Sequence, residues 1–184
     1  QRSCGLMSDL AGRASVADMF ATLRDHGERA NVENRLPQGD DLGHTICMHP
    51  DPANPLRGHS ANSWVSQLLP GQAVHWVTAA ASPCLGVFKP LFSDCGLPEQ
   101  GPTPDEHAST ESRWWWQEQV LRPALEGDLG RWRAYRQERD ALEARFGTQV
   151  QSSLLGDPAQ TLEARQALMV GCWAEADAFQ RRWA

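Results

Sequence analysis

The sequence predicts an α+β domain in which a small antiparallel sheet packs against helices. Segments with strand character are confined to residues 44–94, where β-branched and aromatic residues cluster between turns that contain proline and glycine. Helix-forming sequence lies on both sides of this region. A chain of 184 residues is long enough to bury a substantial core, and we expect a single domain. Its predicted parts are a helix and loop at 1–43, strands at 44–94, a linker at 95–110 and helices at 111–184.

The first predicted helix begins after Ser15. Asp18 follows three residues later, and the two side chains form a capping box that satisfies free amides at a helix start. Gly27 is expected to end this helix. Polar residues 28–43 are predicted to form a surface loop. The apolar face of the helix would consist of Val16, Met19, Phe20 and Leu23.

Three segments of the central region are predicted to be strands. They are Thr45–His49, roughly Ser60–Leu69, and Ala73–Ala79. The proline-rich residues 50–58 can only connect two of them. A Ser-Pro-Cys-Leu turn at residues 82–85 then leads into Phe88-Lys89-Pro90.

The C-terminal third is predicted to be helical, with a kink or break at Pro123 because proline lacks an amide donor. Asp157 and Pro158 have the residue types of an N-cap and a first helical position, so they predict the start of a final helix. Four arginines alternate with acidic residues and are predicted to form a solvated face: Arg131, Arg133, Arg136 and Arg139. The side chains expected to face the core are Trp114, Val120, Leu121, Leu125, Leu129, Trp132, Tyr135, Leu142, Phe146, Leu162, Met169, Cys172, Trp173, Ala176, Phe179 and Trp183.

The composition argues against several classes of partner. A net charge of −6 does not suit a nucleic-acid ligand, which requires a surplus of basic residues. No apolar run approaches the roughly 20 residues of a membrane span. The five cysteines are scattered and form no C-x-x-C pair, so we expect reduced thiols, a cytoplasmic setting and no zinc site built on cysteine. The six histidines also lack metal-ligand spacing, and no metal or cofactor is predicted.

Cys84 is the candidate nucleophile within the chain. It lies in a tight turn after a predicted strand, and His49 or His75 would serve as its base if the fold brings one of them close. The alternative is that Cys84 is a small buried apolar residue, which is the usual role of a free cysteine.

A second candidate site is a polar cluster at the start of the strand near residue 60. Polar groups inside a sheet are unfavourable unless they are paired. The cluster is therefore interpreted either as a substrate-binding edge or as a loop at the rim of the sheet. Its residues are Arg57, His59, Ser60, Asn62 and Ser63.

Several short segments, in order over residues 20 to 125, resemble the C-terminal half of the secernin-like dipeptidases. These enzymes are cysteine-dependent members of the N-terminal-nucleophile (Ntn) hydrolases. Where the family tends to have a Thr-Thr pair, this chain has Ser60-Ala61. The segments are Leu23–Gly27, Thr45–His49, the strand Ser60–Leu68, His75–Thr78, Ala81–Leu85, Phe88–Pro90, and Ser112 with Trp114-Trp115, Glu118 and Arg122.

The resemblance implies part of a four-layer αββα sandwich in which an N-terminal cysteine attacks an amide bond of a small peptide or acyl-amide substrate. Residue 1 here is Gln, so the nucleophile is expected to lie outside this chain, in the N-terminal half of the same enzyme. The chain alone is then expected to be inactive. The alternative is a non-catalytic, secernin-like binding or regulatory module.

Overall fold

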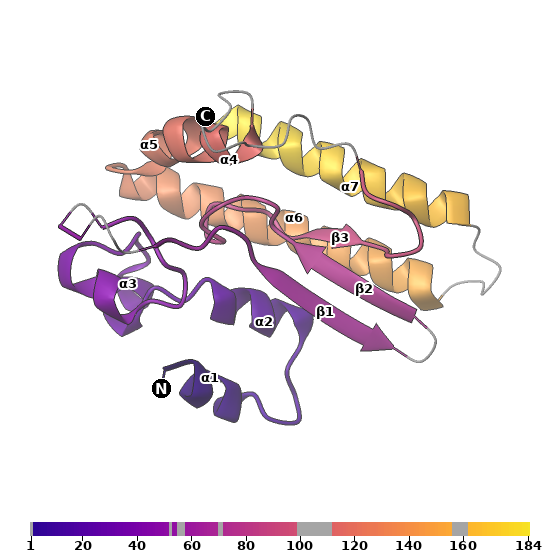
Figure 1. Ribbon diagram of the computed structural model, residues 1–184, viewed down its shortest axis with the longest axis horizontal. Coiled ribbons are helices and arrows are strands. Elements are labelled where there is room, and N and C mark those ends of the chain that lie inside the picture. Colours follow the sequence, from indigo (N-terminus) through magenta and orange to yellow (C-terminus); the bar gives the residue numbers. More distant parts are fainter. Residues whose placement is uncertain (1, 52, 55–57, 70–71, 99–111, 156–161) are drawn as a thin grey trace.

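The computed structural model has a three-stranded antiparallel sheet, short N-terminal helices and two long C-terminal helices, which confirms the predicted α+β class (Figure 1). The structure describes residues 2–184 apart from 52, 55–57, 70–71, 99–111 and 156–161. The 95–110 linker and the proposed Asp157-Pro158 cap therefore lie largely or wholly outside the described residues. Within the described part of the chain, no helix is long and apolar enough to cross a membrane.

The N-terminal region contains more helix than the sequence analysis predicted. The capping box is present, since the Asp18 amide donates to Ser15 Oγ and the Ser15 amide donates to Asp18 Oδ2. The predicted loop at 28–43 was wrong, because a helical turn begins directly after Gly27, whose positive φ of 83° redirects the chain. The helices are α1 (Arg2–Asp9), α2 (Val16–Leu23) and α3 (Glu28–Glu33), followed by a 3₁₀ turn at Gly39–His44.

The sheet consists of β1 (Trp64–Leu69), β2 (Gln72–Val77) and β3 (Lys89–Leu91), in that spatial order. The prediction that Thr45–His49 is a strand was wrong. The amides of Ile46 and Cys47 both donate to the carbonyl oxygen of Asp25, each at 3.0 Å. These amides therefore form hydrogen bonds with a loop and not with a neighbouring strand. The third strand instead follows the Ser-Pro-Cys-Leu turn.

The two faces of the hairpin have different surroundings. Along β1, burial alternates with period two, so Val65 is buried while Trp64 and Leu68 are 51% and 76% exposed. On the covered face, Trp76 of β2 packs edge-on against Phe20 of α2, with ring centroids 5.7 Å apart. The sheet is therefore covered on the side that faces α2 and open on the side that carries Trp64 and Leu68.

The C-terminal helices form an antiparallel pair beside β3 (Figure 1). They are α6 (Leu129–Leu155) and α7 (Leu162–Trp183), preceded by α4 (Arg113–Trp116), a π-helical turn at Gln117–Leu121 and α5 (Arg122–Leu125). Pro123 lies within the short α5, after the π turn that interrupts the regular helix. Most of the core-facing residues predicted for this region are buried, from Leu121 to Phe179. Leu129 and Leu162, the first residues of α6 and α7, are instead exposed, and Val120 and Trp183 are only partly buried. The side chain of Trp114 lies outside the described part of the structure.

A buried ion pair joins α2, α6 and the segment that precedes β3. The Arg24 guanidinium binds both carboxylate oxygens of Glu143, at 2.6 and 2.5 Å, and Glu143 also accepts the amide of Phe88 at 2.6 Å. Both charged side chains are less than one-tenth exposed. Removing one partner leaves the other charge buried and unpaired, which destabilises a protein strongly.

We expect the substitution Glu143→Ala to lower the free energy of unfolding by about 3–5 kcal/mol, because the buried Arg24 charge keeps only a 3.8 Å contact with the exposed Asp140 and the Phe88 amide loses its acceptor. Denaturant unfolding followed by circular dichroism would measure this. Glu138→Ala on the same helix is the matched control. Glu138 is 50% exposed and pairs with the exposed Arg182, so its loss should change stability by no more than about 1 kcal/mol. Equal effects of the two substitutions would contradict the structural role of the buried pair.

Candidate functional site

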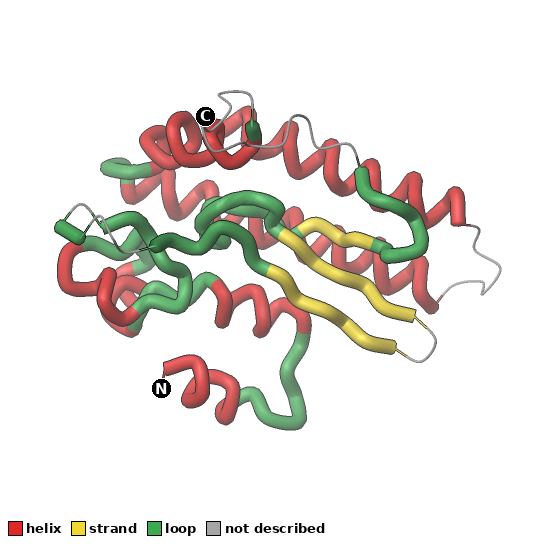
Figure 2. The backbone as a smooth tube through the Cα atoms, in the orientation of Figure 1, coloured by secondary structure: helices red, strands yellow, loops and turns green. Residues whose placement is uncertain are grey.

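The loops of the molecule gather at the end of the sheet where β1 begins and β2 ends (Figure 2). Three of them are joined through backbone groups. The Asp25 carbonyl accepts the amides of Ile46 and Cys47, the Ser60 amide donates to Met48, and the Ser82 amide donates to the Ser60 carbonyl at 2.7 Å. These bonds fix the segments around residues 25, 47 and 82 relative to one another before any side chain is considered.

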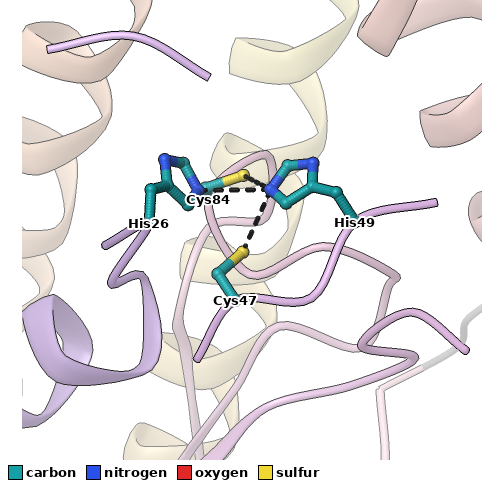
Figure 3. Close-up of side chains that lie close together, drawn as sticks. All are labelled: His26, Cys47, His49 and Cys84. Atoms are coloured by element: carbon teal, nitrogen blue, oxygen red, sulfur yellow. Dashed lines mark hydrogen bonds between the residues drawn. The ribbon is translucent and has the colours of Figure 1, made fainter. Parts of the chain in front are cut away.

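Four side chains from these loops meet at one point (Figure 3). His49 Nε2 lies 3.4 Å from Cys47 Sγ, 3.3 Å from Cys84 Sγ and 3.2 Å from His26 Nε2. The four nitrogen and sulfur atoms all lie within 4.8 Å of one another. Each of the four residues is at most 4% exposed. The cluster therefore concentrates two thiols and two imidazoles away from water.

The outer ring nitrogens of the two histidines face different partners. His26 Nδ1 lies 3.4 Å from the carbonyl oxygen of Arg35, an acceptor that favours a proton on Nδ1. His49 Nδ1 accepts from Arg122 Nη1 at 2.9 Å. Because a guanidinium can only donate, this contact directs the proton of a neutral His49 ring to Nε2, the atom at the centre of the cluster.

Arg122 belongs to a buried polar network behind His49. Its guanidinium donates to both carboxylate oxygens of Glu118, at 2.8 and 3.0 Å, and to Ser82 Oγ at 2.6 Å. The π turn brings Glu118 to the inner side of the chain, where it is 8% exposed. Although burial lowers the pKa of Arg122, the bond and charge of Glu118 raise it overall, so the cation is retained beside His49.

The two thiols differ in electrostatic character. Burial raises the pKa of Cys84, but the bond from the Cys47 thiol and the electrostatic influence of His49 and His26 hold it well below its usual value. The pKa of Cys47 is raised well above its usual value, first by burial and then by the bond to Cys84 and its negative charge. Of the two thiols, Cys84 therefore loses its proton the more easily.

A cavity of about 1070 Å³ between α2, β1 and α6 reaches one side of the cluster. His26 and Cys84 contribute to its wall, together with the charged side chains of Arg24, Arg136 and Glu143. Cys84 nevertheless keeps only 1% of its surface exposed. The cavity thus ends against the cluster and does not open broadly onto the sulfur atom.

Cys84, the candidate nucleophile of the sequence analysis, is therefore close to one of its two expected partners. His49 lies beside its sulfur, whereas His75 is on β2, where its Nδ1 contacts Ser66 Oγ at 3.0 Å. The sequence analysis did not predict roles for Cys47 and His26, because both residues lie far from Cys84 in the sequence. The one available signal was Cys47-x-His49.

The proposed substrate edge has mainly structural partners among its described residues. The Ser60 side chain accepts the amide of Met48, and Asn62 Oδ1 accepts from Thr78 and Ala79. The Ser63 amide donates to Thr78 Oγ1 at 3.1 Å. His59 is partly exposed, and Arg57 lies outside the described residues. A substrate-binding role for these residues stays a prediction.

Arg139 does not belong to a solvated face, as the charge pattern had predicted. It is 2% exposed and donates to the carbonyl oxygen of Cys84. The prediction failed because a buried turn on a neighbouring segment supplies an acceptor that the pattern of charges on α6 cannot reveal.

Comparisons with protein-family models, with curated proteins and with solved structures give no match for this chain.

Replacing Arg139 with Met is expected to lower the free energy of unfolding by about 1–3 kcal/mol, because the Cys84 carbonyl loses its donor inside the protein. Thermal or denaturant unfolding would measure the change. Arg145→Met is the control on the same helix, since Arg145 is 51% exposed and pairs with an exposed glutamate. Its effect should stay within about 1 kcal/mol. An Arg139→Met protein as stable as wild type would contradict the importance of this bond.

Proposed function

We propose that this chain is the C-terminal part of an Ntn-type amide hydrolase that acts on dipeptides or small acyl-amides. In this proposal it contributes one sheet and its helices, while a segment outside these 184 residues contributes the N-terminal cysteine nucleophile. The observation that carries the proposal is the one-sided covering of the sheet. Residues of α2 pack on one face, and the opposite face leaves Trp64 and Leu68 largely exposed.

An αββα sandwich would account for this asymmetry. Its two sheets pack face to face, about 10 Å apart, with helices only on their outer faces. A three-stranded sheet is also small for a stable domain of this architecture. Among the described residues, β1 pairs only with β2, so its other edge is available to continue the sheet. The occupant that fits both features is the N-terminal half of the same enzyme.

The ordered segments that resemble the secernin-like dipeptidases provide the second support. Two of them contain buried groups that contact each other: His49 of Thr45–His49, and Glu118 with Arg122 of the helical segment. The resembling segments are therefore in contact with each other inside the protein, as parts of one fold would be. The nucleophile is assigned outside the chain because Cys84 has too little exposed surface to receive a substrate carbonyl.

Purified residues 1–184 should release no amine from dipeptides or acyl-amides above the buffer rate. Amine release measured with and without iodoacetamide is the assay. Thiol-dependent turnover by the isolated chain would contradict an external nucleophile. Co-expression with the upstream coding region should restore turnover. A stable assembly that binds these substrates without turnover would instead support the alternative of a non-catalytic binding module.

The substitution Leu68→Glu tests the assigned sheet face. Leu68 is 76% exposed, so the isolated chain should keep its stability within about 0.5 kcal/mol. Its affinity for the N-terminal half should fall at least about tenfold, because a carboxylate would be buried between the sheets. Val32→Glu on α3 is the control, since Val32 is 81% exposed and lies outside the sheet. Unchanged association of Leu68→Glu by calorimetry would reject this face as the interface.

A further inference from the structure

Hydrogen bonding alone does not explain the arrangement around His49. Its Nε2 faces three heteroatoms at 3.2–3.4 Å, namely Cys47 Sγ, Cys84 Sγ and His26 Nε2. A neutral imidazole has at most one hydrogen on this nitrogen, and one hydrogen cannot form three well-directed bonds. The protein nevertheless holds all four side chains in place with backbone bonds between their loops. Such convergence is characteristic of ligands around a common centre.

The three distances from His49 Nε2 match the edges of a small tetrahedron. With zinc–nitrogen distances of about 2.0–2.1 Å and zinc–sulfur distances of about 2.3 Å, two nitrogens lie about 3.3 Å apart and a nitrogen and a sulfur about 3.5 Å apart. The observed nitrogen–nitrogen distance is 3.2 Å, and the two nitrogen–sulfur distances from His49 are 3.4 and 3.3 Å. We propose that His26, Cys47, His49 and Cys84 bind one Zn²⁺ ion.

The chemistry of the ligands selects the metal. Two thiolates and two imidazoles suit Zn²⁺, whereas Ca²⁺ and Mg²⁺ require oxygen ligands, which the four residues do not offer. All four coordination positions come from the protein, and all four residues are buried. A site of this kind leaves no position for water or substrate. The ion therefore acts as a structural cross-link between three loops and has no catalytic role.

The contacts of the outer ring nitrogens determine where each neutral histidine holds its proton. The Arg35 carbonyl holds a proton on His26 Nδ1, which leaves Nε2 free for the metal. Zinc at His49 Nε2 must displace the proton that the Arg122 contact directs to this atom. Metal binding therefore releases protons, because cysteine binds a metal as a thiolate and histidine through an unprotonated ring nitrogen.

Elemental analysis of the chain purified without chelators is the first test, and it should find about one zinc per chain. Cobalt added to the chelator-treated protein should give the visible absorption of a tetrahedral ion and a sulfur-to-cobalt charge-transfer band. Chelator treatment should lower the Tm by about 5 °C or more, because the ion binds the folded state preferentially. These measurements use the unmodified chain and do not depend on any variant folding.

Variants identify the ligands. Cys84→Ser and His26→Gln should weaken cobalt and zinc binding by more than about 100-fold, since losing a ligand exceeds the effect of losing an outer partner. Cys95→Ser is the matched control, because Cys95 is also buried but contacts Asp94 outside the cluster. His75→Gln is the corresponding histidine control. Both controls should bind metal as the wild type does.

Several results would overturn the proposal. One is a folded chain that takes up neither zinc nor cobalt and keeps its Tm in chelator. Another is a cobalt spectrum without the sulfur band, or unchanged binding in folded Cys84→Ser. A Cys47–Cys84 disulfide in the chain purified under reducing conditions, detected as a loss of two hydrogens in the intact mass, would do the same. The test is independent of the proposed hydrolase, because no readout requires turnover or an N-terminal half.

Discussion

The structure depends on supplying hydrogen-bond donors to the backbone carbonyl groups of one buried turn. Every residue from Ala80 to Leu91 is buried, so the carbonyl groups between β2 and β3 are removed from water and each needs a donor within the protein. The helices provide these donors with long polar side chains. Arg24, which caps the C-terminal end of α2, donates to Pro83 and Gly86, and Arg139 of α6 donates to Cys84. Further donors are Gln117 of the π turn to Ala81, and Tyr135 of α6 and Gln180 of α7 to Leu85.

This arrangement explains why so many charged and polar side chains lie inside a modest core. The donors tie several helices to the same turn, so the positions of α2, α6 and α7 are mutually constrained. Ser82 adopts a left-handed backbone conformation with φ of 52°, which is unfavourable for a residue with a side chain. Two hydrogen bonds hold it there. Its amide donates to the carbonyl oxygen of Ser60, and its hydroxyl accepts from the Arg122 guanidinium. The turn can then present Cys84 to His49 with little freedom of movement.

The sequence predicted those elements whose causes are local. Ser15 and Asp18 lie three residues apart and specify a helix start on their own, and the β1–β2 hairpin follows from its apolar pattern and short turn. The Thr45–His49 segment has the same β-branched and apolar character, yet its amides are captured by Asp25 and Ser60, which are distant in sequence. The four-residue cluster was missed for the same reason. His49 lies 23 residues from His26 and 35 from Cys84, so only the loop contacts bring them together.

The two proposals concern opposite sides of the sheet, and this separation has a physical consequence. The cluster borders the cavity between α2, β1 and α6, on the covered side, whereas the face assigned to the N-terminal half carries Trp64 and Leu68. An ion at the cluster therefore has no direct contact with a substrate held between two sheets. It would act on the hydrolase only through the loops that lead into β1 and out of β2, because Ser60 and Ser82 are bonded to each other and to the segment that contains Cys47. Loss of zinc should then appear first as loosening of these strand ends. Any effect on turnover would follow from changed sheet geometry rather than from lost metal chemistry.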